Sequence, residues 1–590
     1  MVARRTGLQQ ETPVLEPHGG DDRPQRRRPG AWVPHAWRAG LVVVPAAAVL
    51  VLGYSRRFMS DDGLIYTRVV RQILAGNGPI FNVTERAEAS TSTVWPWMVA
   101  LGSWVSGVSP ERVAVFGGLV LTVVGLAVAL AVTCRLYAGE EARPLLVPAG
   151  VVVLIAVPPV WDFATSGMET GLGTCWLGVC WWLLVRAGDG LSGREAAVVA
   201  VAFGLGPMIR PEFALISVFF LLALVVLTWS SVKRALLLLL AAGALPLAYE
   251  VFRAGYYGVL VPLPALAKEG MSPYWSRGLR YVGDFGGPYW LWWPLVGVAL
   301  LLAVLWLRWR RLGREIVVVT PVIAGLVMLL YVVAVGGDFM HARMLLPPLM
   351  TVLLPVLVVP LTRATVVLAS ATVVWALIGL TPLRPPFAGH PGVQHVRYVD
   401  WAVTKTPNPV TAEQWIRGFP RFPEQVEAAL ATGEPTVLYG STNNFLKTRA
   451  RPDVGSRLVV HGGWLGTVGA VVPLDQTIAD EWSLAYPLGA HFALERRLLF
   501  PGHEKPVSWV WVLADYADPA APPPEGADPA HVAAARRALG CGELRELQES
   551  VRAPMSPARF WRNLTGSLRR TTLRIPTDPF AAERRFCGGG

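Results

Sequence analysis

The stretch Ser60-Asp61-Asp62-Gly63-Leu64-Ile65-Tyr66 places two adjacent carboxylates directly after the first long apolar segment of the chain. A carboxylate just beyond a membrane-spanning helix lies at the membrane surface, where it can serve as a base, a nucleophile or a metal ligand. An aspartate at this place can equally be the N-cap of a surface helix, and the i, i+4 spacing of the apolar residues that follow predicts an amphipathic helix over Asp62–Ala75. The rest of the chain decides between these two interpretations.

The composition indicates a membrane protein. Apolar residues make up 53% of the 590 residues, charged residues only 16%, and the mean hydropathy is +0.43. Many uncharged stretches approach the length that crosses a bilayer, which predicts a polytopic α-helical fold. The net charge of +12 could suggest a nucleic-acid partner. Much of the excess, however, lies in the tail and in loops on one side of the apolar segments, as membrane topology requires, so no nucleic-acid partner is expected.

Basic residues also set the predicted orientation. Residues 1–37, which contain Arg26-Arg27-Arg28, are predicted to form a disordered basic tail in the cytoplasm. The segment 94–108 is apolar but short and rich in Trp, so it could cross the membrane or lie on its surface. The other basic loops fall on the side of the tail only if this segment does not cross. The topology is therefore about eleven spans, a periplasmic juxtamembrane helix at 94–108 and a C-terminus outside.

The predicted spans lie near residues 39–54, 113–134, 145–160, 170–187, 194–209, 212–230, 235–252, 289–307, 316–335, 344–361 and 364–380. The chain then divides into the tail (1–37), a transmembrane domain (38–380) and a soluble domain (381–590), because Pro and Gly rise and the apolar runs stop near 381. Short apolar runs at 435–439 and 507–513 suggest strands, and 531–547 suggests a helix, so the soluble domain is expected to be mixed α/β. Cys541 and Cys587 could pair if this domain is extracytoplasmic.

Under this topology, polar residues from five outer loops gather at the outer membrane surface. They are Asp61, Asp62, Arg68, Arg71 and Glu88; Asp162 and Glu169; Arg210 and Glu212; Tyr256, Tyr257 and Lys268; and Asp338, His341 and Arg343. Simple ion pairs between helix ends explain any one of these pairs. The recurrence of acids and bases in five loops favours a functional site.

Several runs carry a resemblance to a known family. They are Asp61-Asp62-Gly63-Leu64-Ile65, Ala75–Asn82, Glu85–Trp95, Asp162–Glu169, Arg210–Ile216, Gly255-Tyr256-Tyr257-Gly258 and Gly336–Arg343. Together they resemble the actinobacterial terminal β-(1→2) arabinofuranosyltransferases of the GT-C superfamily. The match covers most of the membrane domain in order and is looser in the C-terminal region, chiefly around Ser550–Pro554.

The resemblance implies a glycosyltransferase that moves arabinofuranose from decaprenylphosphoryl arabinofuranose to the non-reducing ends of cell-wall arabinan, in arabinogalactan and lipoarabinomannan. It implies that Asp61 and Asp62 are catalytic and that the C-terminal domain is a periplasmic carbohydrate-binding module. The enzyme is then a multi-pass protein of the plasma membrane, with its active site on the periplasmic face and membrane lipid around it.

A polyprenyl-phosphate donor carries its own leaving group, so no nucleotide-binding loop is needed. The departing phosphate requires cations. The candidates for phosphate binding are Arg68, Arg210, Lys268, His341 and Arg343. The candidates for other substrate contacts are Arg71, Glu88, Trp95, Asp162, Glu169, Glu212, Tyr256, Tyr257 and Asp338.

One of the two aspartates should activate the acceptor hydroxyl as a base or act as a nucleophile, and which of them does so stays open. No dedicated metal-ligand cluster is visible in the sequence, and a divalent cation between carboxylates and phosphate remains an alternative. Two rival functions remain: a transferase that uses another polyprenyl-phosphate sugar such as mannose, and a flippase or transporter of lipid-linked sugars. Transporters tend to show inverted repeats and ionisable residues near mid-span, and this chain shows neither.

Overall fold

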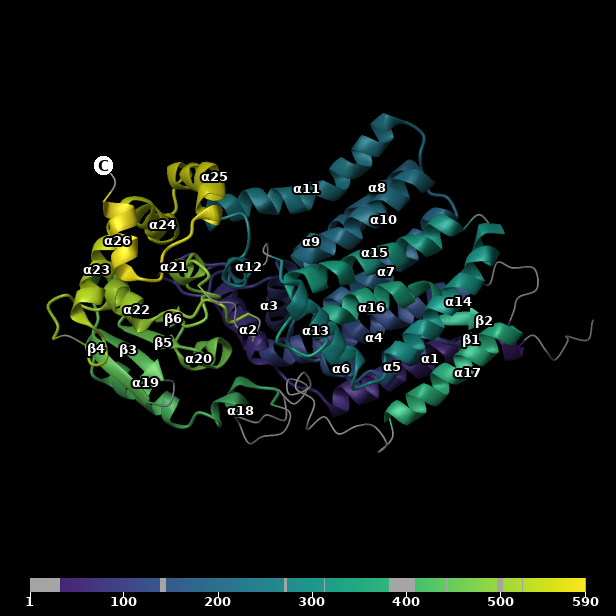
Figure 1. The fold of residues 1–590 in the computed structure, drawn as a ribbon, viewed down its shortest axis with the longest axis horizontal. Coiled ribbons are helices and arrows are strands. Elements are labelled where there is room, and N and C mark those ends of the chain that lie inside the picture. The colour runs from purple at the N-terminus through teal and green to yellow at the C-terminus, as the bar shows by residue number, and fades with distance from the viewer. Residues whose placement is uncertain are drawn as a thin grey trace, which may run out of the picture.

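The computed structural model describes residues 32–137, 145–269, 273–311, 314–380, 409–441, 444–495, 502–522 and 524–588. Residues up to 380 form a bundle of helices, and those from 409 onward form a region of helices and strands at one end of the bundle (Figure 1). Most of the predicted tail (1–37) and the predicted start of the soluble domain at 381 lie outside the described residues.

Four described helices are long and apolar enough to cross a membrane: α1 (Trp32–Ser55), α4 (Pro110–Leu136), α11 (Val232–Tyr256) and α15 (Glu315–Val335). Further helices of the bundle are α7 (Thr170–Gly188), α8 (Gly193–Gly204), α9 (Gly206–Ile209), η1 (Pro211–Phe213), α10 (Ala214–Leu227), α14 (Trp292–Arg311) and α17 (Arg363–Leu380). Helices therefore occupy most of the predicted span positions. Several are shorter than a bilayer requires, and the count of eleven crossings is not confirmed.

Two predicted spans are broken into short helices and a strand. The segment near 145–160 consists of β1 (Leu146–Pro148), α5 (Gly150–Ala156) and α6 (Pro158–Asp162). The segment near 344–361 consists of η2 (Arg343–Leu345), α16 (Leu346–Leu353), η3 (Leu354–Val356) and β2 (Val358–Pro360). Prolines interrupt both segments, because a proline removes a donor from the helix ladder. Antiparallel pairing of β1 with β2 then satisfies backbone groups that the broken helices leave open.

The loop after α1 contains the predicted amphipathic helix, which is confirmed as α2 (Asp61–Leu74). Ser60 caps it by accepting a hydrogen bond from the Gly63 amide at 2.9 Å. The predicted juxtamembrane segment is also a helix, α3 (Val94–Ser106), and it exposes Trp97 and Trp104. Two further short helices in the connections of the bundle are α12 (Leu263–Ala267) and α13 (Trp275–Gly286).

The C-terminal region is built on a four-stranded sheet with the order β4-β3-β5-β6. Its strands are β3 (Thr436–Ser441), β4 (Asn444–Arg449), β5 (Leu458–Gly462) and β6 (Thr477–Asp480). β3 pairs antiparallel with β4, whereas the β3–β5 and β5–β6 pairs are parallel. The crossover from β5 to β6 contains α20 (Leu465–Val471), which lies against α2 of the bundle. The strand expected at 435–439 is thus confirmed.

Helices cover the sheet and complete this region. They are α18 (Ala412–Ile416), α19 (Arg421–Ala431), η6 (Pro452–Val454), α21 (Pro487–Ala490), α22 (Trp509–Tyr516), α23 (Pro529–Leu539), α24 (Gly542–Arg552), α25 (Pro557–Thr572) and α26 (Pro579–Cys587). The strand expected at 507–513 is wrong: this run is helix α22, capped by Ser508, and burial of nearly all its residues hides the helical period. The helix expected over 531–547 is broken at Gly540-Cys541, and Cys541 forms a disulfide with Cys587.

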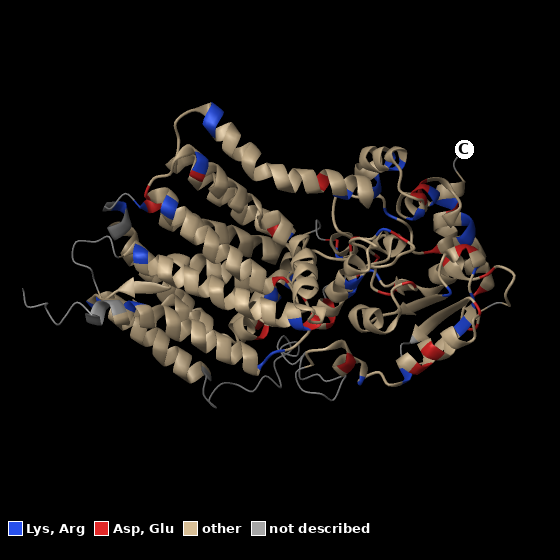
Figure 2. Cartoon of the chain, turned by 180° about the vertical axis from the view of Figure 1, so that it is seen from behind, with Lys and Arg blue, Asp and Glu red and all other residues tan. Residues whose placement is uncertain are grey.

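Charge follows this architecture. Figure 2 shows long helices almost without charge, basic residues at their ends far from the C-terminal region, and mixed acids and bases at the junction of the two regions. Lys233 and Arg234 at the start of α11 belong to the far end. Helix α2 lies at the junction, where it packs against both α3 and α20. The charged side chains of a functional site are therefore expected at the junction of the two regions.

Candidate active site

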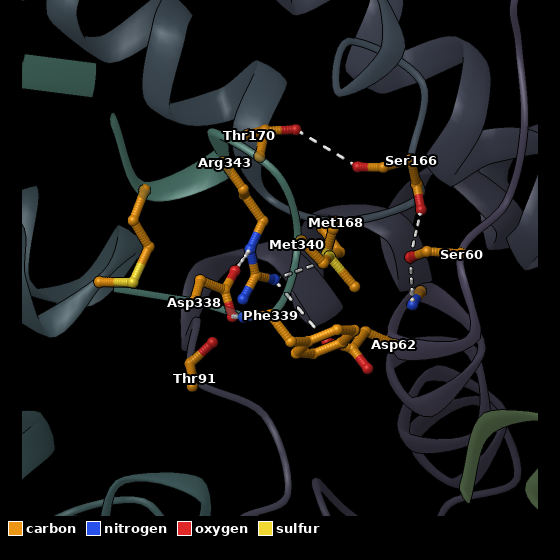
Figure 3. A network of polar contacts seen from close by, with 12 residues as sticks. Ser60, Asp62, Thr91, Ser166, Met168, Thr170, Asp338, Phe339, Met340 and Arg343 are labelled. Atoms are coloured by element: carbon orange, nitrogen blue, oxygen red, sulfur yellow. Dashed lines mark hydrogen bonds and ion pairs between the residues drawn. The ribbon is translucent and has the colours of Figure 1, made fainter. Parts of the chain in front are cut away.

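Asp62 lies at the start of α2 beside Arg343 and Asp338 (Figure 3). The Arg343 Nε donates to Asp338 Oδ2 at 2.5 Å, and Arg343 Nη1 lies 3.7 Å from Asp62 Oδ2. Asp338 also accepts from the Phe339 amide at 3.0 Å. The Asp62 side chain is 22% exposed, whereas those of Arg343 and Asp338 are 7% and 4% exposed. Asp62 is therefore the member of this group that a substrate can reach.

Local geometry holds Asp62 in this position. The Ser60 hydroxyl donates to the Ser166 carbonyl at 2.8 Å, which ties the start of α2 to the loop before α7 (Figure 3). Gly63 permits the close approach, because a Cβ there would lie 2.7 Å from the same carbonyl oxygen. On the other side, Gly337 adopts a φ of 72° that lets the loop after α15 turn back toward α2. Three loops thus fix the carboxylate.

A second charged group lies next to the first. Arg210 donates to both Glu169 and Glu212, the latter at 2.5 Å. Glu169 Oε2 is buried without a hydrogen-bond partner. The charge of Arg343 acts on Glu169, and the charge of Glu169 acts on Asp62, so the two groups form one electrostatic unit. Asp62, Glu169, Arg210, Glu212, Asp338 and Arg343 are the predicted residues that the fold brings together, and Lys268 is near enough for its charge to act on both aspartates.

The two aspartates of this group differ in their electrostatics. Burial raises the pKa of Asp62 above its ordinary value, and the positive charges of Arg343 and Lys268 only partly oppose this. Burial also acts to raise the pKa of Asp338, but Arg343 and Lys268 hold it below the ordinary value. Asp338 is thus the fixed counter-ion of Arg343. Asp62, with its raised pKa, is the one of the two whose affinity for a proton is increased.

An apolar cavity in the bundle ends at these cations. It is lined by Val49, Leu126, Leu154, Phe163, Leu177, Phe213, Met328, Leu346 and Met350, among others, and by Arg210, Glu212 and Arg343. Hydrocarbon walls that end at two guanidinium groups match a ligand with an apolar chain and an anionic head. Among the described residues, no three His, Cys, Asp or Glu side chains are arranged to hold a metal ion.

Asp61 has a different environment from its neighbour. Its Oδ2 accepts from the Gly466 amide at 3.0 Å, and its Oδ1 accepts from the Thr467 amide at 2.8 Å and the Thr467 hydroxyl at 2.7 Å. The residue is only 5% exposed. Burial raises its pKa to about 6, against the effect of these hydrogen bonds. Asp61 therefore joins α2 to α20 of the C-terminal region.

Arg68, on the same helix, does not support the predicted role in phosphate binding. Its guanidinium donates to five backbone carbonyls, those of Phe81, Gly469, Val472, Pro473 and Gln476, at 2.6–3.2 Å. A guanidinium has five N–H donors, so none is left for a ligand. Burial lowers the pKa of this fully enclosed arginine to about 9. Arg68 therefore has a structural role: its hydrogen bonds connect α2 to the C-terminal region.

The other predicted residues are likewise engaged elsewhere. Three of them form ion pairs: Arg71 with Glu111, Glu88 with Arg253, and Asp162 with Arg56. Tyr249 also donates a hydrogen bond to Glu88. Trp95 donates to the Gly167 carbonyl, Tyr257 donates to the Pro79 carbonyl, His341 is hydrogen-bonded to Tyr289, and Tyr256 stacks on Phe252. The structure does not bring these side chains to Asp62. Their polar groups form ion pairs and hydrogen bonds between helices and loops instead. This is the structural interpretation that the sequence could not exclude.

Sequence reasoning missed Gly466 and Thr467, which hold Asp61, and Met168, whose sulfur accepts from Arg343 Nη1 at 2.9 Å. Met168 lies inside a run that already contained two candidates, so its neighbourhood was indicated. Gly466 and Thr467 are about 400 positions from Asp61, and no local pattern connects them.

Comparison with known proteins gives the family. Residues 455–584 match a family model described as "AftB family C-terminal domain". A protein of Mycobacterium tuberculosis named terminal β-(1→2)-arabinofuranosyltransferase is 35% identical over 92% of this chain and 96% of its own length. A protein of the same name from Corynebacterium glutamicum is 34% identical over 89% of this chain and 84% of its own. No solved structure matches the chain significantly. At this identity and coverage, the chain belongs to the family of terminal β-(1→2)-arabinofuranosyltransferases, which are membrane glycosyltransferases.

Proposed function

We propose that this enzyme transfers arabinofuranose from decaprenylphosphoryl arabinofuranose to the non-reducing ends of cell-wall arabinan, with Asp62 as the reactive carboxylate. The observation that carries the assignment is the position of Asp62, partly exposed and 3.7 Å from a buried arginine at the end of an apolar cavity. The relatives' names supply the sugar and the β-(1→2) linkage.

Asp62 has the properties of a general base for the acceptor hydroxyl. None of the described residues forms hydrogen bonds to Asp62 of the kind that Gly466 and Thr467 donate to Asp61. Burial raises the pKa of Asp62, which increases its affinity for a proton, and its closest guanidinium is 3.7 Å away. The developing positive charge at the sugar is stabilised by the surrounding carboxylates of Glu169 and Asp338, which are fixed by Arg210 and Arg343. A nucleophilic role for Asp62 uses the same geometry.

The donor phosphate is assigned to Arg343, Arg210 and Lys268. Arg343 and Arg210 line the apolar cavity, so a phosphate on them would direct the adjoining isoprene units between α4, α7 and α16. Each arginine already compensates a carboxylate, which keeps the buried charges paired when the site is empty. Arg68 and His341 are left out of the site because their polar groups are engaged elsewhere.

We further propose that the junction and the C-terminal region face the periplasm and that the C-terminal region binds the arabinan acceptor. Two observations support the orientation. Basic residues gather at the opposite ends of the long helices, as the positive-inside rule requires. The Cys541–Cys587 disulfide belongs to an oxidising compartment.

A transfer assay tests the proposal. Membranes that contain the enzyme receive, in separate reactions, radiolabelled polyprenyl-phosphate arabinofuranose or polyprenyl-phosphate mannose together with an arabinan oligosaccharide. Label should enter the oligosaccharide only from the arabinofuranose donor, and linkage analysis should find a new terminal β-(1→2) residue. Membranes with Asp62→Asn enzyme provide the blank. Label from the mannose donor, or transfer by Asp62→Asn at the normal rate, would contradict the assignment.

A further inference from the structure

Helix α25 carries an exposed face that the catalytic site does not use. One side of the helix is buried against α24 through Arg559, Asn563 and Arg570. The other side exposes Trp561 and Leu568, whose exposed fractions are 62% and 64%. Large apolar side chains that are this exposed on a helix with a polar inner face are unusual in a water-soluble region.

The position of α25 explains this pattern. Helix α11 exposes an apolar stripe at its C-terminal half, formed by Ala244, Leu247, Ala248 and Val251. The spacing i, i+3, i+4, i+7 is that of one helix face, and on a helix that can cross a membrane this face meets lipid. The next position of the stripe is Gly255, where α25 begins to cover α11.

Phe560 of α25 occupies that position. A Cβ on Gly255 would lie 2.2 Å from the Phe560 ring, so only a glycine admits the ring here. The Leu260 amide donates to Thr571 Oγ1 at 2.9 Å, and Arg570 Nε donates to the Gly258 carbonyl at 2.8 Å, which fixes the C-terminal end of α25 to the segment after α11. Figure 1 shows α25 beside the end of α11 that adjoins the C-terminal region. α25 therefore lies on the lipid-facing side of α11, where α11 leaves the bilayer.

Around α25, the exposed or half-buried side chains change from apolar next to α11 to basic on the far side. With 3.6 residues per turn, the sequence of side chains around the helix, starting from the contact with α11, is Phe560, Leu564, Leu568, Trp561 and then Arg569 and Arg562. The apolar members adjoin the lipid-facing stripe of α11, and the basic members come last. Arg562 and Arg569 are exposed, and Arg569 also pairs with Glu543. An apolar edge followed by a basic edge, with a Trp between them, is the arrangement of a helix that lies in a membrane interface.

We propose that α25 lies in the outer interface of the bilayer, with Leu564, Leu568 and Trp561 among the upper acyl chains and Arg562 at anionic lipid headgroups. The C-terminal region then contacts the membrane surface directly, in addition to its attachment through α2. The inference requires only that α11 is embedded in a bilayer. It does not depend on the sugar that is transferred, so its failure and that of the proposed function are distinguishable.

Spin labels measure this placement. The substitutions Trp561→Cys and Leu568→Cys, and the control Glu427→Cys at an exposed position of α19, are introduced one at a time into the full-length enzyme. In this enzyme Cys134, Cys175 and Cys180 are replaced by alanine and the native disulfide is kept. After nitroxide labelling, the enzyme is reconstituted in vesicles of phosphatidylcholine with phosphatidylglycerol. Collision rates with oxygen, which concentrates in lipid, and with a water-soluble nickel chelate are compared by electron paramagnetic resonance.

The labels at 561 and 568 should collide preferentially with oxygen, by about tenfold relative to the label at 427, as expected for groups below the headgroup level. In detergent-free nanodiscs of phosphatidylcholine alone, Arg562→Gln should leave this unchanged, whereas in the anionic vesicles it should move both labels toward the nickel reagent. Equal access of the nickel chelate to positions 561, 568 and 427 would overturn the proposal. Because both labelled side chains are exposed, loss of folding is not expected and is checked by the thermal unfolding midpoint.

Discussion

Asp61 and Asp62 are consecutive residues of α2, yet they face two different regions of the molecule. Asp61 faces α20 of the C-terminal region and accepts three hydrogen bonds there. Asp62 faces the helical bundle, where its nearest cation is 3.7 Å away and its side chain is partly exposed. A saturated, buried carboxylate holds structure, and a carboxylate that lies among charges but is not saturated can do chemistry. One helix thus contacts both regions, with its attachment to the C-terminal region and the proposed reactive carboxylate on adjacent residues.

Asp62→Asn tests the proposed chemical role of Asp62, and its effect on the transfer rate is the largest that we expect. The amide cannot accept the proton of the acceptor hydroxyl, so the transfer rate should fall by about 100- to 10,000-fold, as when a general base is removed. The thermal unfolding midpoint should stay near that of the wild type, because Asp62 makes no strong hydrogen bond. Transfer within tenfold of the wild type would remove Asp62 from the mechanism.

Arg68→Met tests the attachment side. The substitution keeps much of the aliphatic chain but removes the donor to five carbonyls. Those of Phe81 and Pro473 keep a second donor, from Gln72 and Gln476, whereas those of Gly469, Val472 and Gln476 lose the arginine. We expect a loss of stability of about 3 kcal/mol or more, because each buried carbonyl that loses its donor costs about 1–3 kcal/mol. The measurement is thermal unfolding in detergent, with Arg71→Met as the matched control, since Arg71 is on the same helix but makes one ion pair with Glu111. An unchanged midpoint for Arg68→Met would show that the C-terminal region is held by other contacts.

The pH dependence of stability should separate the wild type from the Asp61→Asn variant. Because burial raises the pKa of Asp61 from 3.8 to about 6, the folded chain binds a proton between these values that the unfolded chain has lost. The contribution of Asp61 to the free energy of unfolding therefore falls as the pH rises through this window, by up to roughly 3 kcal/mol. The amide of the variant does not titrate and has no such dependence. The wild-type midpoint minus the Asp61→Asn midpoint should thus decrease from pH 4 to about pH 6, and a difference that rises with pH would contradict the raised pKa.

The smallest effect is expected for transfer by Asp61→Asn at neutral pH. The amide oxygen still accepts from Thr467, and the amide nitrogen loses only the Gly466 contact, worth about 1 kcal/mol. Transfer per folded molecule, measured below the unfolding temperature, should stay within about tenfold of the wild type. A loss as large as that of Asp62→Asn would mean that both aspartates take part in the reaction.

Much of this architecture could be predicted from the sequence, because apolar length and period are local properties. Helix α2, the helix at 94–108 and most of the predicted span positions follow from them. The broken segments at 145–160 and 344–361 could not, since their prolines permit either a kinked helix or an interruption, and the β1–β2 pairing that decides the matter joins residues over 200 positions apart. The sequence of helix α22 shows no helical period of apolar residues, because the helix is buried on nearly every side.

The candidate site was predicted in part for a similar reason. The predicted topology placed Asp62, Glu169, Arg210, Asp338 and Arg343 at one membrane surface, and the structure brings these side chains together. The same argument also assigned Arg68, Arg71, Glu88, Asp162 and His341 to the site. A sequence indicates which residues lie near one end of the spans, but it does not show which other residues they bind. The α20 contacts of Asp61 and Arg68 lie 401–408 positions away and had no sequence signal.

The long separation between Arg68 and its carbonyl partners has a consequence for biogenesis. Helix α2 follows the first span and leaves the translocon early, but α20 and the segment after it are synthesised roughly 400 residues later. Until they are synthesised, Arg68 lacks four of its five carbonyl acceptors and α2 lacks its contact with α20. We therefore expect the nascent chain to be inactive until the C-terminal region has been synthesised and has packed against α2.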